Sequence, residues 1–226
     1  MSFARSTLLL AALPLGLAGC AGLGRPRTTP VRAVVLAPVP TKADRWLAVA
    51  SAADTDRLRR LGLAWDQGLR EARAGRFGAA LREEGELLAP NAALARPAPT
   101  PGSYNCRLLR LGKTGRRAPA FERFKPFFCY VEVEADLLTI VKQTGSERPA
   151  GRLWEDDVAT RLIFLGSVAL GNEEQPKAYG EDQARDMAGL FERVGPMRFR
   201  LVVPWPRSNA KLEVIELTPV ADQPKS

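Results

Sequence analysis

Apolar side chains between residues 41 and 90 recur at intervals of three and four positions, which is the spacing of one face of an amphipathic helix. The clearest series is Leu58, Leu61, Trp65, Leu69 and Ala72. Asp54 or Thr55 is expected to cap the helix that carries this series. A second run follows the break at residues 74–75 and stops before Pro90, so the pattern predicts a helical hairpin or a bent pair. Such a stripe is typical of a packed core, and docking of a partner is the alternative.

A different period begins after the prolines at positions 97, 99 and 101, which mark an extended connector. Val131 and Val133 alternate with two glutamates, as in a half-buried strand. Strands are predicted at residues 104–111, 127–134, 137–142, 152–154, 161–170, 189–194, 198–203 and 212–217. The predicted fold class is α+β, with N-terminal amphipathic helices followed by mostly antiparallel strands. Because closure removes unpaired edges, these strands are expected to form a small β-barrel or a curved meander. A β-sandwich is the alternative.

The first twenty residues are typical of an export signal. Arg5 precedes an apolar run at residues 8–17 that is too short to remain as a membrane-spanning helix. The sequence Leu17-Ala18-Gly19-Cys20 matches the lipobox of bacterial lipoproteins. This resemblance implies cleavage before Cys20, acylation of Cys20 and a lipid anchor in the cell envelope. Ala21 follows where inner-membrane lipoproteins commonly carry aspartate, so we expect an outer-membrane protein facing the periplasm. An ordinary signal peptide with an incidental cysteine is the alternative.

The predicted organisation therefore has four parts. They are a lipoprotein signal peptide at residues 1–19, a flexible tether at 20–40, a helical segment at 41–95 and an antiparallel β domain at 96–220. The chain is 46% hydrophobic, which is enough for a core. One domain with a helical appendage fits this pattern as well as two small domains.

Three cysteines occur in the chain, and lipidation of Cys20 leaves Cys106 and Cys129. Because export places the chain in an oxidising compartment, we expect these two to form a disulfide. There is no histidine, so a zinc site would lack most of its usual ligands, and no metal is expected.

The formal net charge of +8 favours anionic partners, such as an anionic envelope component or an acidic protein. An envelope location excludes nucleic acid. Cations concentrate in and after the first predicted strand, and an arginine pair flanks a later turn. The candidate anion-binding residues are Arg107, Arg110, Lys113, Arg116, Arg117, Arg148 and Arg152, with Arg123 and Lys125 near the first group. For the net charge the alternative is a solvated surface whose arginines reflect nucleotide composition. For the cluster it is a solvated loop whose phenylalanines plug the barrel, and for the arginine pair it is pairing with Asp156, Asp157 or Asp186.

The absence of histidine excludes Ser-His-Asp and Cys-His catalysis, and no phosphate-loop or dinucleotide-binding motif occurs. No cofactor is expected. A glycosidase needs only two carboxylates, for which residues 155–157, 173–174 and 181–182 are candidates in predicted turns. No catalytic residue is assigned. The sequence favours a non-catalytic envelope binding or inhibitor-like module, and a carboxylate-dependent enzyme acting on envelope glycan is the alternative.

Several short motifs resemble those of one bacterial family. They are Tyr104-Asn105-Cys106-Arg107, Phe128-Cys129, Thr144-Gly145-Ser146 with Gly151-Arg152-Leu153, Asp186-Met187-Ala188-Gly189 and residues 201–206. The chain is similar over most of its predicted mature length to the uncharacterised family known as domain of unknown function 4893. That resemblance supports the domain limits and implies no activity. The barrel and cysteine pair also resemble small periplasmic inhibitor barrels, at the level of the fold alone.

Overall fold

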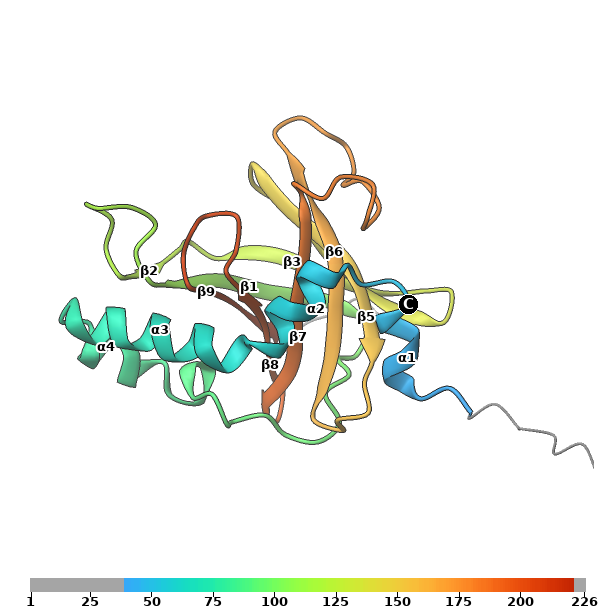
Figure 1. Cartoon of the computed structure of the whole chain (residues 1–226), viewed down its shortest axis with the longest axis horizontal. Helices are drawn as coiled ribbons and strands as arrows, with labels where there is room; N and C mark the ends of the chain where they lie inside the picture. Colours follow the sequence, from blue (N-terminus) through green and yellow to red (C-terminus); the bar gives the residue numbers. More distant parts are fainter. Residues whose placement is uncertain (1–38, 222–226) are drawn as a thin grey trace, which may run out of the picture. The chain divides into compact units, whose positions relative to one another are not determined.

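The structure is a computed structural model and describes residues 39–221. The predicted signal peptide, Cys20 and almost all of the predicted tether lie outside the described residues. Helices precede strands along the chain (Figure 1), which confirms the predicted α+β class. The helices are α1 (Lys42–Leu47), α2 (Ala52–Arg59), α3 (Leu61–Ala74), α4 (Gly78–Glu83) and the 3₁₀ helix η1 (Gly85–Leu88).

The first helices begin at hydroxyl side chains. The Thr41 hydroxyl accepts a hydrogen bond from the Asp44 amide, and the Ser51 hydroxyl accepts one from the Asp54 amide, so each cap satisfies a backbone donor of a first turn. The prediction of a cap at Asp54 or Thr55 is therefore wrong. The helix starts earlier because Ser51 can cap it, and Asp54 lies within its first turn, where a carboxylate favours the helix dipole.

Within residues 39–221, nine strands form one antiparallel sheet. They are β1 (Gly102–Leu111), β2 (Phe121–Arg123), β3 (Phe127–Glu134), β4 (Leu137–Lys142), β5 (Glu147–Glu155), β6 (Arg161–Leu170), β7 (Asp186–Gly195), β8 (Arg198–Pro204) and β9 (Leu212–Pro219). Consecutive strands pair from β3 to β9, and β1 pairs with both β3 and β9. This pairing closes an eight-stranded barrel, with β2 as an extra strand.

The extra strand β2 continues the edge of β1 that β3 occupies. β1 pairs with β3 from Gly102 to Cys106 and with β2 from Leu109 to Leu111. Residues 124–126, which include Pro126, separate the two partners. Because proline cannot donate to a ladder, the interruption falls where the sequence no longer supports pairing.

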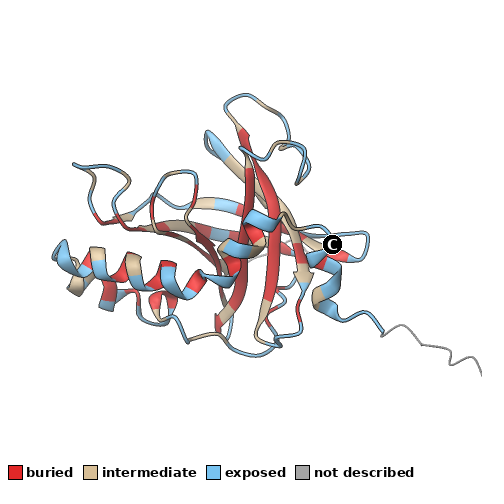
Figure 2. Ribbon diagram, in the orientation of Figure 1, coloured by how far each residue is buried: buried red, intermediate tan, exposed pale blue. Residues whose placement is uncertain are grey.

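Buried apolar side chains form two clusters, one inside the barrel and one between the outer face of the barrel and the helices. Inward-facing side chains such as Phe164, Phe191 and Leu201 fill the interior. Outward-facing side chains of β1 and β6–β9 pack instead against the stripe of α3 and its neighbours, including Trp65 and Leu69. Strands β6 and β7 are consequently buried on both faces (Figure 2). The predicted helical stripe is therefore part of a core that it shares with the barrel.

Arg200 points outward from β8 and joins the barrel to the helical layer. Its side chain is 0% exposed and lies 5.1 Å from the ring centre of Trp65. The guanidinium donates to the carbonyl oxygens of Leu87 at 3.0 Å and Ala89 at 2.8 Å, and also to those of Glu86 and Pro90. It forms an ion pair with Glu192 at 2.7 Å. One buried cation thus satisfies the orphan carbonyls at the end of η1.

Cys106 and Cys129 form the predicted disulfide across β1 and β3, with their Cα atoms 6.0 Å apart. In the register of these strands Cys106 lies opposite Phe127 and Cys129 lies opposite Tyr104, so the bond joins diagonal neighbours. Both cysteines face the barrel interior. The bond therefore fastens the first strand of the barrel to the second.

Candidate functional site

Three arginines of the predicted basic cluster are paired with acids. Arg107 contacts Glu84 and Glu216, and Arg110 contacts Glu213 at 2.8 Å and Glu122 at 3.7 Å. Arg123 binds Glu84 at 2.6 Å and Glu83 at 2.9 Å. Burial alone would raise the pKa of Glu84, but hydrogen bonds from Arg107 and Arg123 lower it below its usual range. Most of these acids come from the helical segment and β9, so the sequence near the cluster gave no sign of them.

The predicted Arg148 and Arg152 pair does not converge on one point. Arg148 donates to the carbonyl oxygens of Gly145 at 2.9 Å and Gly171 at 2.8 Å, and so joins two turns. Arg152 pairs with Glu134 at 2.7 Å on the outside of the barrel. The alternative for these arginines was pairing with Asp156, Asp157 or Asp186, and none of these aspartates is a partner of either one.

Lys113, Arg116 and Arg117 lie in the loop between β1 and β2, whereas Lys125 is exposed between β2 and β3. The Lys113 amide donates to the Glu71 carboxylate at 2.9 Å, and the Phe77 and Phe121 rings are 6.0 Å apart, so this loop packs beside the end of α3. Figure 1 shows the loop, α3 and α4 reaching the same end of the fold. Tertiary packing thereby joins the loop to arginines that are distant in sequence.

We call this surface the basic end. Within residues 39–221 its side chains are exposed and make no ion pair: Arg70, Arg73, Arg76, Arg82, Lys113, Arg116 and Arg117. Nearby acids are largely engaged, because Glu71 contacts Lys211 at 3.7 Å and Glu83 binds Arg123. Asp66 on α3 is exposed and offsets one charge. Arg70, Arg73 and Arg82 on the helices and Arg76 in the turn between them were not among the predicted site residues, because exposed arginines on the polar face of a helix give no distinctive signal in the sequence.

Arg76 occupies a conformation that glycine usually adopts. Its φ angle is 67°, and the Phe77 amide donates to the Ala72 carbonyl at 3.0 Å, as in the left-handed turn that ends many helices. A non-glycine residue there costs on the order of 1 kcal/mol. The fold therefore holds an exposed cation at a position where glycine would be less strained.

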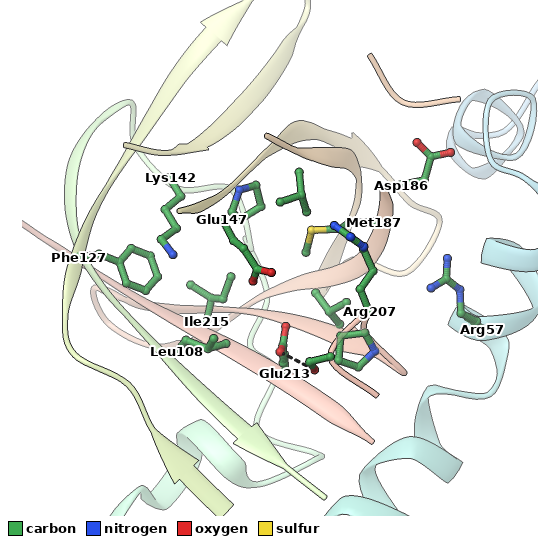
Figure 3. Close-up of a pocket in the computed structure, with 15 residues that line it drawn as sticks. Arg57, Leu108, Phe127, Lys142, Glu147, Asp186, Met187, Arg207, Glu213 and Ile215 are labelled. Atoms are coloured by element: carbon green, nitrogen blue, oxygen red, sulfur yellow. Dashed lines mark hydrogen bonds between the residues drawn. The ribbon is translucent and has the colours of Figure 1, made fainter. Parts of the chain in front are cut away.

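A second charged surface surrounds one end of the barrel, where β4, β6 and β8 end and β5, β7 and β9 begin. We call it the barrel mouth. It contains a cavity of about 70 Å³ with apolar walls formed by Leu108, Phe127, Val168, Met187, Val203 and Ile215. Lys142, Glu147, Arg207 and Glu213 bring charge to it (Figure 3). None of these four residues was a predicted site residue, because Lys142 and Glu147 flank an ordinary turn in the sequence.

Lys142 is the partly buried charge of the mouth. Its ammonium lies 4.3 Å from the ring centre of Phe127 and makes no hydrogen bond or ion pair with the described residues. Burial lowers the pKa of Lys142, and the charges of Glu147 and Glu213 partly oppose that effect. Glu213 is engaged with Arg110 at 2.8 Å and accepts a hydrogen bond from the Ser208 hydroxyl at 2.9 Å. The ammonium is therefore a partly buried cation at the mouth that has no anion at bonding distance among the described residues.

Asp186 and Arg57 lie at the edge of this group (Figure 3). Asp186 is 4% exposed; one carboxylate oxygen accepts from the Gly180 amide at 3.0 Å, while the other has no partner among the described atoms. Burial raises the pKa of Asp186 above its ordinary range. Arg57 forms an ion pair with Asp54 on α2.

The first run of carboxylates considered for the alternative function, residues 155–157, makes contacts that hold the fold together. Asp156 is buried and accepts from the Trp46 indole at 3.1 Å and from Arg161 at 2.5 Å. Asp157 accepts from the amide of Lys42 at 3.1 Å, at the start of α1. Glu155 pairs with the Lys42 side chain at 3.3 Å. These acids fasten α1 to the barrel and do not line the mouth.

The other predicted carboxylates belong to the loop between β6 and β7. Glu173 binds Arg185, and this hydrogen bond, with a second from the Leu170 amide, lowers the pKa of Glu173 to about 2. A general acid needs the opposite shift. Asp182 pairs with Lys177 at 3.3 Å, and Glu181 accepts from the Ala178 amide at the same distance. Glu174 lines a groove of about 760 Å³ on the outside of the barrel, together with Trp154 and Tyr179 among others.

The fold and these two surfaces define a class of protein: a closed antiparallel barrel that carries a helical layer and presents charge at its mouth and at one end. The chain belongs to the family described as domain of unknown function (DUF4893), whose sequence profile matches residues 46–217. This range runs from α1 into β9 and confirms the resemblance seen in the motifs. No curated protein and no solved structure matches the chain.

Two further properties concern the described residues alone. Across residues 39–221 no helix combines the length and the apolar character needed to cross a bilayer. The same residues contain no group of three or more histidine, cysteine, aspartate or glutamate side chains arranged to hold a metal ion.

Proposed function

We propose that this protein is a non-catalytic, lipid-anchored module of the bacterial cell envelope that binds an anionic envelope component through its basic end. The observation that carries the proposal is that α3, the turn after it, α4 and the β1–β2 loop reach the same end of the fold and carry seven exposed cations that make no ion pair with the described residues. The lipobox match at Cys20 supports the location, and the absence of histidine supports a role without acid–base chemistry at neutral pH.

Electrostatic attraction to an anionic surface contributes about 1 kcal/mol for each lysine or arginine close to it. Seven cations on one surface therefore suffice for binding once the lipid anchor has raised the local concentration. Since exposed charges are screened over about 8 to 10 Å at ordinary salt, the binding must weaken as ionic strength rises. The paired arginines Arg107, Arg110 and Arg123 contribute less, because their acids neutralise them.

The strained cation is compatible with this proposal. Arg76 has a left-handed backbone conformation at the end of α3, and its side chain makes no ion pair with the described residues. Strained conformations of this kind cluster at functional sites. Four other non-glycine residues, Arg96 among them, also have a positive φ angle, so the strain agrees with a binding role for Arg76 but does not single it out.

Charge reversal of Arg116 and Arg117 to glutamate tests the proposal with the soluble domain and vesicles of phosphatidylglycerol and phosphatidylcholine. The matched control reverses Arg59 and Arg96, which are exposed elsewhere and change the net charge by the same amount. We expect at least a tenfold loss of vesicle binding for the first pair, since about 1 kcal/mol per cation is removed and repulsion is added. Equal losses for both pairs, or binding that does not respond to salt, would contradict the proposal.

Arg76→Gly separates binding from folding. The substitution relieves a left-handed strain, so the free energy of unfolding should rise by up to about 1 kcal/mol. Vesicle binding should fall at the same time, because one cation is removed. Opposite signs for stability and binding cannot come from damage to the fold. If the variant gains stability and still binds vesicles as well as the parent, Arg76 does not contribute to binding.

The anchor is tested by Cys20→Ser in the bacterial host. We expect the substituted protein to carry no fatty acid and to leave the membrane fraction, while the parent stays with the outer membrane. Metabolic labelling with palmitate and cell fractionation measure both properties. Fatty acid on the substituted protein would refute the lipobox assignment without bearing on the basic end.

A further inference from the structure

The barrel mouth carries an observation that the basic end does not explain. A partly buried ammonium, that of Lys142, reaches a cavity of about 70 Å³ without a hydrogen bond or ion pair to any described residue. A charge taken out of water costs free energy unless a partner of opposite sign compensates it. The folded chain therefore presents a cation for which it supplies no anion at bonding distance.

The walls of the cavity restrict what that anion can be attached to. Phe127, Val168 and Ile215 are among the apolar side chains around it, and the barrel interior beneath is filled by residues such as Phe164 and Leu201. A water molecule needs roughly 10 to 15 Å³ of such space, so the cavity holds about five water-sized groups. A carboxylate group attached to two or three further carbon atoms fits this space, whereas a long acyl chain does not.

The rim favours a single negative charge. Arg207 is exposed at the mouth and has no ion pair within residues 39–221, so it offers a second cation. Glu147, Glu213 and the buried Asp186 also line the mouth, and negative charge there would repel a phosphate dianion more strongly than a carboxylate. Glu213 is held by Arg110 and Ser208 and does not turn to Lys142 within bonding distance. Figure 3 shows Lys142 and Glu147 entering the mouth from β4 and β5, with Arg207 reaching in from the β8–β9 loop.

We propose that the barrel mouth binds a carboxylate carried on a short apolar chain, with Lys142 as its ion-pair partner and Arg207 as a second cation at the rim. The carboxylate can belong to a free short-chain acid or to the C-terminal residue of a peptide, and both present the same group to Lys142. The hydrocarbon part contacts Phe127, Val168 and Ile215. This site is separate from the basic end and does not depend on it.

Chemical-shift titration of the folded domain with butyrate and with butyramide tests the ligand chemistry. The two probes have nearly the same shape and differ in charge. Butyrate should bind with a dissociation constant in the millimolar range, as expected for so few atoms, and should shift the signals of Phe127 and Ile215. Butyramide should bind at least tenfold more weakly. The proposal would be overturned if butyrate and butyramide bound equally well. It would also be overturned if neither butyrate nor a short peptide with a free C-terminus gave a saturable shift.

A short peptide ending in alanine, compared with its C-terminal amide, distinguishes the source of the carboxylate. Tighter binding of the free peptide than of butyrate assigns the site to a peptide terminus, and the reverse order assigns it to a free acid. Either order supports the shared carboxylate chemistry, provided that the amide loses at least tenfold.

Lys142→Met and Lys125→Met provide the matched pair of variants. Methionine keeps the apolar stem of Lys142, removes the uncompensated charge and should raise the melting temperature while carboxylate binding falls at least tenfold. Lys125 is exposed outside the mouth, and its substitution should change neither property. Undiminished butyrate binding by Lys142→Met would overturn the proposal. The Arg116 and Arg117 reversal should leave butyrate binding intact, so the two proposals fail independently.

Discussion

Replacing Arg200 by methionine removes a single side chain that connects the helical layer to the barrel. Arg200 is 0% exposed, donates to the carbonyl oxygens of residues 86, 87, 89 and 90, and pairs with Glu192 at 2.7 Å. Methionine fills much of the volume but leaves those carbonyl oxygens without a donor. It also leaves the carboxylate of Glu192, which is 8% exposed, without its ion-pair partner. Breaking a buried ion pair by removing one partner costs about 3 to 5 kcal/mol.

Urea unfolding followed by tryptophan fluorescence measures this loss, since Trp65 lies beside the guanidinium. A loss of that size should lower the melting temperature by roughly 10 °C. The control is Arg59→Met, an exposed position where the change should stay within about 0.5 kcal/mol. Adding Glu192→Gln to Arg200→Met should recover part of the loss, because the stranded charge disappears. A loss below about 1 kcal/mol for Arg200→Met, or no recovery in the double variant, would refute this reasoning.

Three further outcomes concern stability. Reducing the bond between Cys106 and Cys129, which are 23 positions apart, should cost about 3 kcal/mol and roughly 6 to 12 °C in melting temperature; calorimetry with and without reductant measures it. Asp186→Asn should stabilise the fold at neutral pH. Because burial raises the pKa of Asp186 above 3.8, the folded chain holds the proton more tightly, and that contribution is lost as the pH rises through the folded pKa; unfolding at several pH values checks it. Gly166→Ala should destabilise by about 1 to 3 kcal/mol, since its Cβ would lie 2.1 Å from the Ala150 carbonyl oxygen.

The strands were predictable where branched and aromatic residues were concentrated between turn residues. The predicted boundaries of β3, β4 and β6 agree with the structure for this reason, and β3 also shows alternation of apolar and polar residues. Strand β5 was foreseen only at residues 152–154, since Pro149 and Gly151 argue against a strand. Pro149 is tolerated because it lies beyond the last residue pair between β4 and β5, and Gly151 is required by its close approach to Gly166. Strand β2 was missed because three residues carry no period.

The charged surfaces were predictable in kind but not in membership. Sequence proximity grouped Arg107 and Arg110 with Arg116 and Arg117, yet the first two meet acids from segments about a hundred positions away or from the helices. Conversely, the arginines of α3 join the β1–β2 loop only when the helix packs on the barrel. Lys142 gave no signal, because the sequence does not tell which lysine at a strand end points inward. Ion pairing and burial depend on tertiary contacts, whereas the periodicity of the sequence indicates only local secondary structure.

The pairing of β1 with β9 sets an order for folding. Residues 104–111 pair with residues 212–219, so one side of the first strand stays without its neighbour until the last strand is present. Contacts so far apart in the chain close slowly, because a long loop must be ordered before they form. A chain that ended after β8 would carry two open sheet edges at once, on β1 and on β8, and open edges invite pairing with other chains. The last eight residues of the sheet therefore do more than complete a barrel: they end the period in which the chain is prone to aggregate.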